Sequence, residues 1–228
     1  MDNKTYEFVE DKTMTIQQYI NNIFKWMVIG VLTTFITAYA LEKTTFIYNE
    51  SMLPLLLIFF QFAVVIGLSR HLMTMKPIMA KVLYITYSVL TGVTFSYVVA
   101  SYTTLSVGLA FLVAAIYFGV LVILGTVVKM DLTRIGTVCL AGLFVYIIFS
   151  IVMLFFNFGI LSLLMPFISL VLFAGITAYD MQKSLQLYNN AVSNPEMLEK
   201  LSIYGAFSLY LDFVNIFLNI LRLLGDNK

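Results

Sequence analysis

Long hydrophobic runs separated by short polar segments recur along the whole chain. Each run has about seventeen residues or more, enough for a helix to cross a hydrocarbon core of about 30 Å. The polar segments between them carry charged residues together with Pro and Asn, which are typical of turns. The pattern predicts seven membrane-spanning helices, at residues 23–41, 52–68, 82–99, 105–128, 135–156, 160–179 and 201–224.

The polar segments are too short to form a second domain. We therefore predict one all-α membrane domain over residues 1–228, with a cytoplasmic N-terminal segment at 1–22, seven transmembrane segments within 23–224 and a tail at 225–228. The first 22 residues are mixed in charge and lack the basic start and cleavage site of a signal peptide, so we expect the first hydrophobic segment to be retained.

The composition supports a membrane protein. Hydrophobic residues make up 61% of the chain and charged residues 11%, whereas about a quarter of a globular chain is charged. Seven crossings from a cytoplasmic N-terminus leave all Lys and Arg residues inside except Lys43, Arg222 and Lys228, as the positive-inside rule favours. Moving Arg222 and Lys228 inside would strengthen this bias, so a re-entrant last segment is an alternative.

Several kinds of chemistry are excluded by the residues that the chain lacks. Cys139 is its single cysteine and His71 its single histidine, so it has no intramolecular disulfide, zinc-thiolate site or His-rich metal site. There is no phosphate-binding glycine motif, and the net charge of +1 argues against nucleic acid as a partner. We expect no tightly bound cofactor.

Two acidic residues, Asp180 and Asp212, lie within or at the end of the last two hydrophobic runs. A charged side chain at the bilayer centre costs about 2.5 to 3.5 kcal/mol on insertion scales, and such residues usually mark a functional site. Asp212 belongs to a polar stripe with helical spacing, formed by Tyr204, Ser208, Asp212, Asn215, Asn219 and Arg222. This stripe must face the bundle interior or water.

The third hydrophobic segment carries its own polar stripe, which includes Thr91, beside Gly92. Small and hydroxyl residues of this kind allow helices to pack closely and hydrogen-bond within a membrane. We interpret the stripe first as packing surface and second as the lining of a cavity. Asn215 and Asn219 equally suit hydrogen bonding between helices.

Three motifs resemble those of the Bax inhibitor-1 family, the transmembrane Bax inhibitor motif proteins. They are YSVLTGVTFS at residues 87–96, ITAYDMQ at 176–182 and SLYLDFVNIFLNILRLLG at 208–225. The resemblance spans nearly the whole chain and keeps the family's order of motifs. It implies a seven-helix bundle around a central C-terminal helix, acting as a pH-sensitive calcium leak channel.

The resemblance also assigns roles to residues. Asp180 and Asp212 correspond to the family's paired aspartates, the pH sensor of the pore, and Arg70 to the basic residue that pairs with the first aspartate as a latch. Lys76 and Lys81 are competitors for this latch. The stretch at 181–200 is long for a bacterial member, so the loop beside Asp180 is expected to differ from the family's.

Elementary chemistry is consistent with these roles. Two carboxylates in a dry site cannot both ionise cheaply, so they tend to share one proton. When both are ionised they form an oxygen-rich anionic site suited to Ca²⁺, the ion that we expect to be transported. Asp180 and Asp212 are thus the predicted Ca²⁺ ligands, with Ser208, Asn215, Asn219 and Thr91 as supporting polar positions.

Two other functions use the same features. An intramembrane aspartyl protease also pairs aspartates on neighbouring helices, but its Gly-x-Gly-Asp and Pro-Ala-Leu motifs are missing, because Leu209-Tyr-Leu precedes Asp212. A regulatory protein that modulates a protease or a stress or cell-death pathway by contact is the other alternative, with membrane proteins as partners and residues 183–200 as its surface. The bacterial plasma membrane is the expected location.

Overall fold

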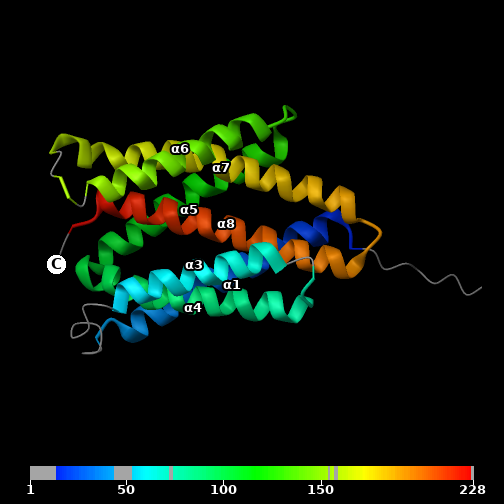
Figure 1. The fold of residues 1–228 in the computed structure, drawn as a ribbon, viewed down its shortest axis with the longest axis horizontal. Helices are drawn as coiled ribbons and strands as arrows, with labels where there is room; N and C mark the ends of the chain where they lie inside the picture. The colour runs from blue at the N-terminus through cyan, green and yellow to red at the C-terminus, as the bar shows by residue number, and fades with distance from the viewer. Residues whose placement is uncertain (1–13, 44–52, 72–73, 154, 157–158, 227–228) are drawn as a thin grey trace, which may run out of the picture.

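The chain folds into a bundle of long helices that run in alternating directions (Figure 1). The computed structural model describes residues 14–43, 53–71, 74–153, 155–156 and 159–226. Its helices in this part of the chain are α1 (Ile16–Leu41), α3 (Leu53–His71), α4 (Pro77–Ser101), α5 (Thr104–Val127), α6 (Thr133–Val152), α7 (Ile160–Ala191) and α8 (Pro195–Leu224).

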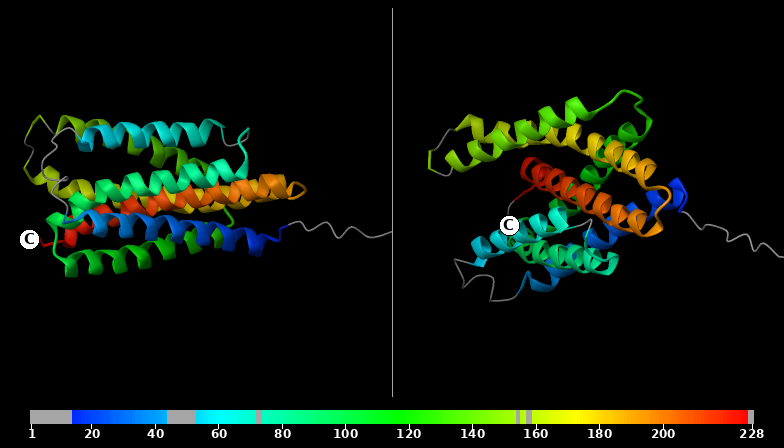
Figure 2. Two further views of the ribbon diagram at one scale, coloured as in Figure 1. Left: turned by 90° about the horizontal axis from the view of Figure 1, so that it is seen from below. Right: turned by 45° about the vertical axis from the view of Figure 1, so that its right-hand side comes forward.

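The C-terminal helix α8 forms the centre of the bundle (Figure 2). It packs against α1, α4, α5 and α7, while α3 packs against α4 and α6 packs against α7. Aromatic rings fill the contact of α8 with α1, α4 and α5, where Phe217 lies 5.4 Å from Phe35 and 5.7 Å from Phe95 between ring centroids. The predicted all-α bundle with a central C-terminal helix is therefore confirmed.

Local sequence signals set where several helices begin. Thr15 accepts a hydrogen bond from the backbone amide of Gln18, whose side chain accepts one from the Thr15 amide, so the two residues form a capping box before α1. Asn194 caps α8 by accepting a hydrogen bond from the Met197 amide at 3.0 Å, and Pro195 lies in the first turn of this helix. Such side chains satisfy amides that have no partner within the helix.

The outer surface of the bundle is apolar, as a lipid environment requires. Large hydrophobic side chains such as Phe59, Ile116 and Val138 are more than 60% exposed. Among the described residues, six helices, α1 and α4 to α8, are long and apolar enough to cross a membrane. The chain is an integral multi-pass membrane protein. A crossing by α3, the remaining predicted span, stays a prediction, and residues 1–13 of the predicted N-terminal segment lie outside the described residues.

The last two helices are longer than the hydrophobic runs that predicted them. The prediction of a loop over residues 183–200 is wrong, because α7 continues to Ala191 and α8 begins at Pro195. The two helices form a hairpin closed by residues 192–194. The re-entrant alternative for the last segment is not what the fold shows, since α8 is one continuous helix that ends at the opposite end of the bundle from the start of α1 (Figure 1).

Candidate functional site

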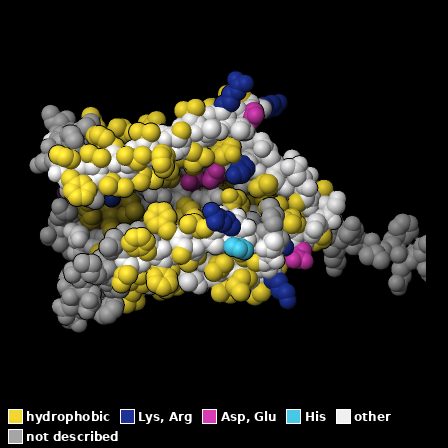
Figure 3. Space-filling model, in the orientation of Figure 1, with side chains coloured by type: hydrophobic (Ala, Val, Ile, Leu, Met, Phe, Trp, Pro, Cys, Tyr) yellow, Lys and Arg dark blue, Asp and Glu magenta, His cyan; other side chains and the backbone are white. Residues whose placement is uncertain are grey.

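A hollow separates the two outer parts of the bundle (Figure 3). On one side α3 rests on α4, on the other α6 rests on α7, and α8 lies between them. The hollow contains a cavity of about 360 Å³ lined by residues of five helices. They are Gln61, Phe62, Val65, Tyr87, Leu140, Leu143, Phe173, Ile176, Asp180, Ser208, Leu211, Asp212 and Asn215.

The structure brings Asp180 and Asp212 together at this cavity. Asp180 lies on α7 and is half-buried, whereas Asp212 on α8 is only 3% exposed. The two carboxyl groups are close enough for the charge of one to act on the other. Asp212 Oδ2 and Thr177 Oγ1 are both buried, and the Thr177 hydroxyl lies close enough to interact with the Asp212 carboxyl group. A pair of carboxyl groups from two helices therefore lines the cavity.

Close helix packing fixes the position of Asp180. Gly125 of α5 and Gly136 of α6 leave room for α7, because a Cβ atom at Gly136 would lie 2.3 Å from Tyr179 Cγ and one at Gly125 would lie 2.4 Å from the Ala178 carbonyl oxygen. Asp180 comes directly after these two α7 residues, Ala178 and Tyr179, in the chain. Its height and rotation in the bundle are thus set by backbone and ring contacts.

Gln182 ties the same part of α7 to the loop between α5 and α6. Its Nε2 donates hydrogen bonds to the carbonyl oxygens of Val128 (3.2 Å) and Met130 (2.9 Å), and its Oε1 accepts one from the Leu132 amide (2.8 Å). One turn from Asp180, Lys183 extends over the rings of Tyr179 and Tyr204. The conspicuous motif at residues 176–182 therefore combines a cavity-facing acid with the residues that hold it.

The predicted supporting residues fall into three positions. Ser208 and Asn215 line the cavity with the aspartates. Asn219 lies farther along α8, where its Nδ2 donates hydrogen bonds to Ser169 Oγ (2.9 Å) and to the Asn215 carbonyl oxygen (2.8 Å). Thr91 is buried but does not line the cavity. The stripe on α8 predicted the cavity better than the stripe on α4.

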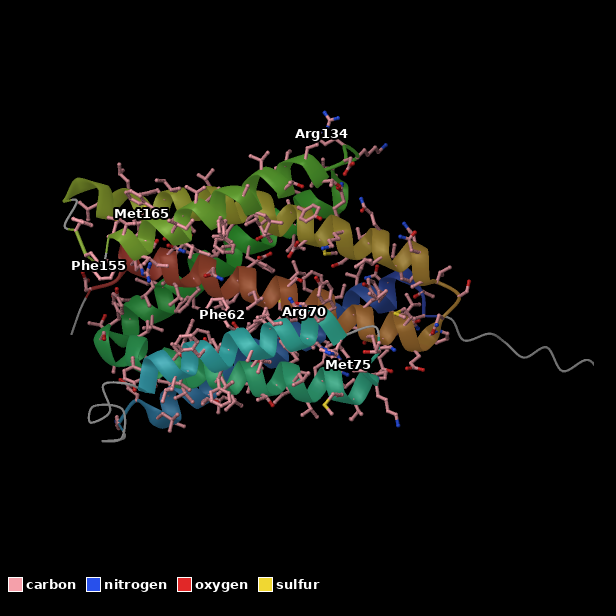
Figure 4. The ribbon with its side chains drawn as sticks, viewed as in Figure 1. Phe62, Arg70, Met75, Arg134, Phe155 and Met165 are labelled. Atoms are coloured by element: carbon pink, nitrogen blue, oxygen red, sulfur yellow. The ribbon has the colours of Figure 1, made fainter. Side chains whose placement is uncertain are left out.

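Arg70 lies in the last turn of α3, exposed on the side of the acidic hollow (Figure 4). Among the described residues it has no ion pair, and it does not line the 360 Å³ cavity. Lys81, one of its competitors as a latch, instead pairs with Glu199 of α8, with 2.5 Å between Nζ and Oε1. Lys76 lies in the same polar cluster as that pair.

Two features of the site escaped sequence reasoning. Gln61 of α3 lines the cavity and donates a hydrogen bond to Thr94 Oγ1 of α4 at 3.0 Å. A buried hydroxyl group also joins three helices, because Thr34 Oγ1 of α1 lies 2.7 Å from Tyr210 Oη of α8 and 3.0 Å from the Ser88 carbonyl oxygen of α4. The single glutamine within the second hydrophobic run was the available signal for Gln61.

The fold and site together define a multi-pass helical membrane protein with an acidic cavity beside its central helix. Residues 16–228 match the sequence model of the family described as inhibitor of apoptosis-promoting Bax1. The chain therefore belongs to the Bax inhibitor-1 family, as its motifs indicated.

Bacterial relatives of similar length support this membership. The chain is 33% identical over 221 residues to the inner membrane protein YbhL of Escherichia coli K12, and the matched region covers 93% of each of the two chains. An uncharacterized protein of Deinococcus radiodurans is 34% identical, covering 96% of this chain and 95% of its own. An uncharacterized protein of Borreliella burgdorferi is 32% identical, and the matched region covers 92% of this chain and 93% of that protein.

Proposed function

We propose that this protein is a pH-sensitive calcium leak channel in which Asp180 and Asp212 form the cation site. The observation that carries the proposal is that two carboxyl groups from different helices line one membrane-embedded cavity, and that one of them, Asp212, is almost completely buried. Acidic groups inside a membrane domain usually face a water-filled path or an ion site.

The number of ligands fits an ion that passes through better than one that stays. Ca²⁺ takes about six to eight oxygen ligands when a protein holds it tightly. Within the described residues, no group of three or more His, Cys, Asp or Glu side chains is placed to hold a metal ion. Two carboxylates, with Ser208 and Asn215 nearby, leave most of the coordination shell to water and so favour weak, reversible binding.

Proton binding at the same groups supplies the pH sensitivity. Neighbouring carboxylates in a site of low dielectric repel each other, so ionisation of the second group is opposed by the first. A protonated pair loses most of its attraction for Ca²⁺, and its charge-dependent attraction for Arg70 weakens as well. Protonation therefore changes both ion affinity and the forces that hold α3 against the hollow.

A second cavity extends the possible route along α8. It measures about 460 Å³ and shares Leu143, Phe173 and Asn215 with the cavity that contains the aspartates. Its lining continues to Arg222, in the last turn of α8. A path for a hydrated ion would therefore have the aspartates in its middle and the second cavity toward the end of the bundle.

Calcium flux into proteoliposomes tests the proposal. We expect flux that changes with pH in the wild-type protein, and a strongly altered flux with loss of the pH response in Asp180→Asn and Asp212→Asn. Asp226→Asn is the matched control, because this exposed aspartate follows α8 and does not line either cavity. Unchanged flux and pH response in both cavity variants, at normal membrane insertion, would rule out the proposed site.

A further inference from the structure

The second cavity lies at the level of the bundle where lipid headgroups are expected. Arg222 is in the last turn of α8, and Ser150 and Ile151 are near the end of α6, which finishes at Val152. The helices run from side to side in Figures 1 and 3, so the hollow seen in Figure 3 opens through the side of the bundle, toward lipid. The cavity is therefore accessible from the bilayer.

The cavity carries a positive charge that the described protein does not neutralise. Arg222 is the one charged residue among the described lining residues, and the described part of the chain provides no ion pair for it. Asp226, one turn farther on, does not pair with it. The backbone of Asp226 is instead bound to the neighbouring helix, through a hydrogen bond from its amide to Ser106 Oγ at 2.9 Å. An anion would complement this guanidinium.

A buried acceptor beside Arg222 adds a second requirement. Asn219 is 4% exposed and lines the cavity one turn before Arg222. Its Nδ2 is engaged with Ser169 and Asn215, but its Oδ1 has no hydrogen-bond partner among the described residues. A buried acceptor without a partner is unfavourable, so a donor placed there would be stabilised. The ligand that suits the cavity thus combines an anionic group with a hydrogen-bond donor.

We propose that this cavity binds the headgroup of a membrane phospholipid, with its phosphate on Arg222 and a headgroup hydroxyl or ammonium donating to Asn219. A phosphodiester next to a glycerol or ethanolamine group has both parts in the required order. The remaining lining is largely apolar, and Ile147 and Ile151 are 46% and 53% exposed. Acyl chains can therefore lie along α6 while the headgroup occupies the cavity. The lipid would occupy the outer end of the proposed ion path, but its binding does not require calcium transport.

Native mass spectrometry of the purified full-length protein tests it, with phosphatidylglycerol, diacylglycerol and soluble glycerol phosphate as the three probes. We expect phosphatidylglycerol to bind best and Arg222→Gln to weaken it about tenfold or more, the effect of losing a charge-assisted hydrogen bond. Arg222→Lys should have an intermediate effect, because lysine keeps the positive charge but cannot form the bidentate hydrogen bonds of a guanidinium group with a phosphate. Arg134→Gln, an exposed arginine at the other end of α6, is the matched control and should bind normally.

A photoreactive phosphatidylglycerol provides a second measurement. It should label the α6 segment that contains Ile147 and Ile151 in the wild type, and this labelling should be lost in Arg222→Gln. Equal binding of diacylglycerol, or an equal loss in Arg134→Gln, would overturn the proposal. Glycerol phosphate that binds as tightly as the lipid would also overturn it, by showing that the site takes a free anion. If Arg222→Gln does not fold, phosphatidylglycerol binding by Arg222→Lys is compared with that by the wild type. Weaker binding by Arg222→Lys would support the proposal, and equal binding would overturn it.

Discussion

Lys81 of α4 and Glu199 of α8 form an ion pair, with 2.5 Å between Nζ and Oε1, at the end of the bundle where α1 begins. The Lys81 ammonium also lies over the ring of Trp26, 5.5 Å from its centroid. This lysine therefore joins three helices outside the acidic cavity. Arg70, by contrast, has no ion pair within the described residues, so it is the more available partner for the aspartates.

Neutralising these two basic residues should have different effects. If Arg70 acts as the latch, Arg70→Gln should raise calcium flux about fivefold or more, the lower end of typical coupling energies. Lys81→Gln should leave flux unchanged and cost about 0 to 1 kcal/mol of stability, because its ion pair is partly exposed. The opposite result in the proteoliposome assay would transfer the latch role to Lys81.

The packing of α6 on α7 should be sensitive to a single methyl group. In Gly136→Ala the new Cβ would lie 2.3 Å from Tyr179 Cγ, so the ring next to Asp180 must move. We expect a loss of about 1 to 3 kcal/mol, as for other overpacked sites, seen as a lower melting temperature in detergent. Gly119→Ala is the control, because a Cβ there meets nothing within 4 Å. Equal melting of the two variants would contradict this account.

The hydroxyl groups of two tyrosines, Tyr210 and Tyr97, should differ in how much they contribute to the stability of the protein. Tyr210→Phe removes a hydrogen bond of 2.7 Å with Thr34 between α8 and α1, and we expect a loss of about 0.6 kcal/mol, the average for such bonds in membrane helices. Tyr97→Phe removes a buried hydroxyl that has no partner among the described residues. It should be neutral or stabilising. Melting temperatures of both variants, measured under one condition, test the difference.

The start of α6 should respond to acid. Hydrogen bonds from the Thr133 hydroxyl and amide, with the charge of Arg134, hold the pKa of Asp131 below its usual value. The ionised carboxylate thus stabilises this turn above the unfolded pKa of about 3.9, and the effect is lost as pH falls through the lower folded pKa.

Hydrogen exchange at the first turn of α6 can detect this contribution. Exchange should be faster in Asp131→Asn than in the wild type at pH 6, because the variant lacks the ionised acceptor. The two proteins should converge only when the pH falls below the lowered folded pKa of Asp131, where the wild-type carboxyl group is protonated. Comparing the proteins at the same pH cancels the intrinsic pH dependence of exchange. A difference that persists unchanged in acid would contradict the role of the ionised group.

The sequence predicted the bundle well because its main signal is chemical and local. Runs of apolar residues mark helices in a membrane regardless of their partners, and the spacing of Ser208, Asp212 and Asn215 placed these residues on one face of α8 before any contact was known. All three line the cavity with Asp180.

The parts that sequence reasoning missed depend on contacts between helices or on helices that leave the membrane. Residues 183–191 are polar enough to resemble a loop, yet they continue α7 because Ser184 and Tyr188 are buried against the bundle. The hydrogen bond of Tyr188 Oη to the Met14 carbonyl oxygen joins residues far apart in the chain. No local pattern encodes such a contact. The pairing of Lys81 with Glu199 rather than with an aspartate has the same origin.

The hairpin formed by α7 and α8 has a mechanical consequence. α7 has 32 residues, about 48 Å at 1.5 Å per residue, which exceeds the hydrocarbon core by a wide margin. Asp180 and Asp212 both lie on helices that continue without a break into the turn at residues 192–194. A displacement or rotation of that turn would therefore be transmitted along two continuous helices to the carboxyl groups, because no flexible segment interrupts either helix in between.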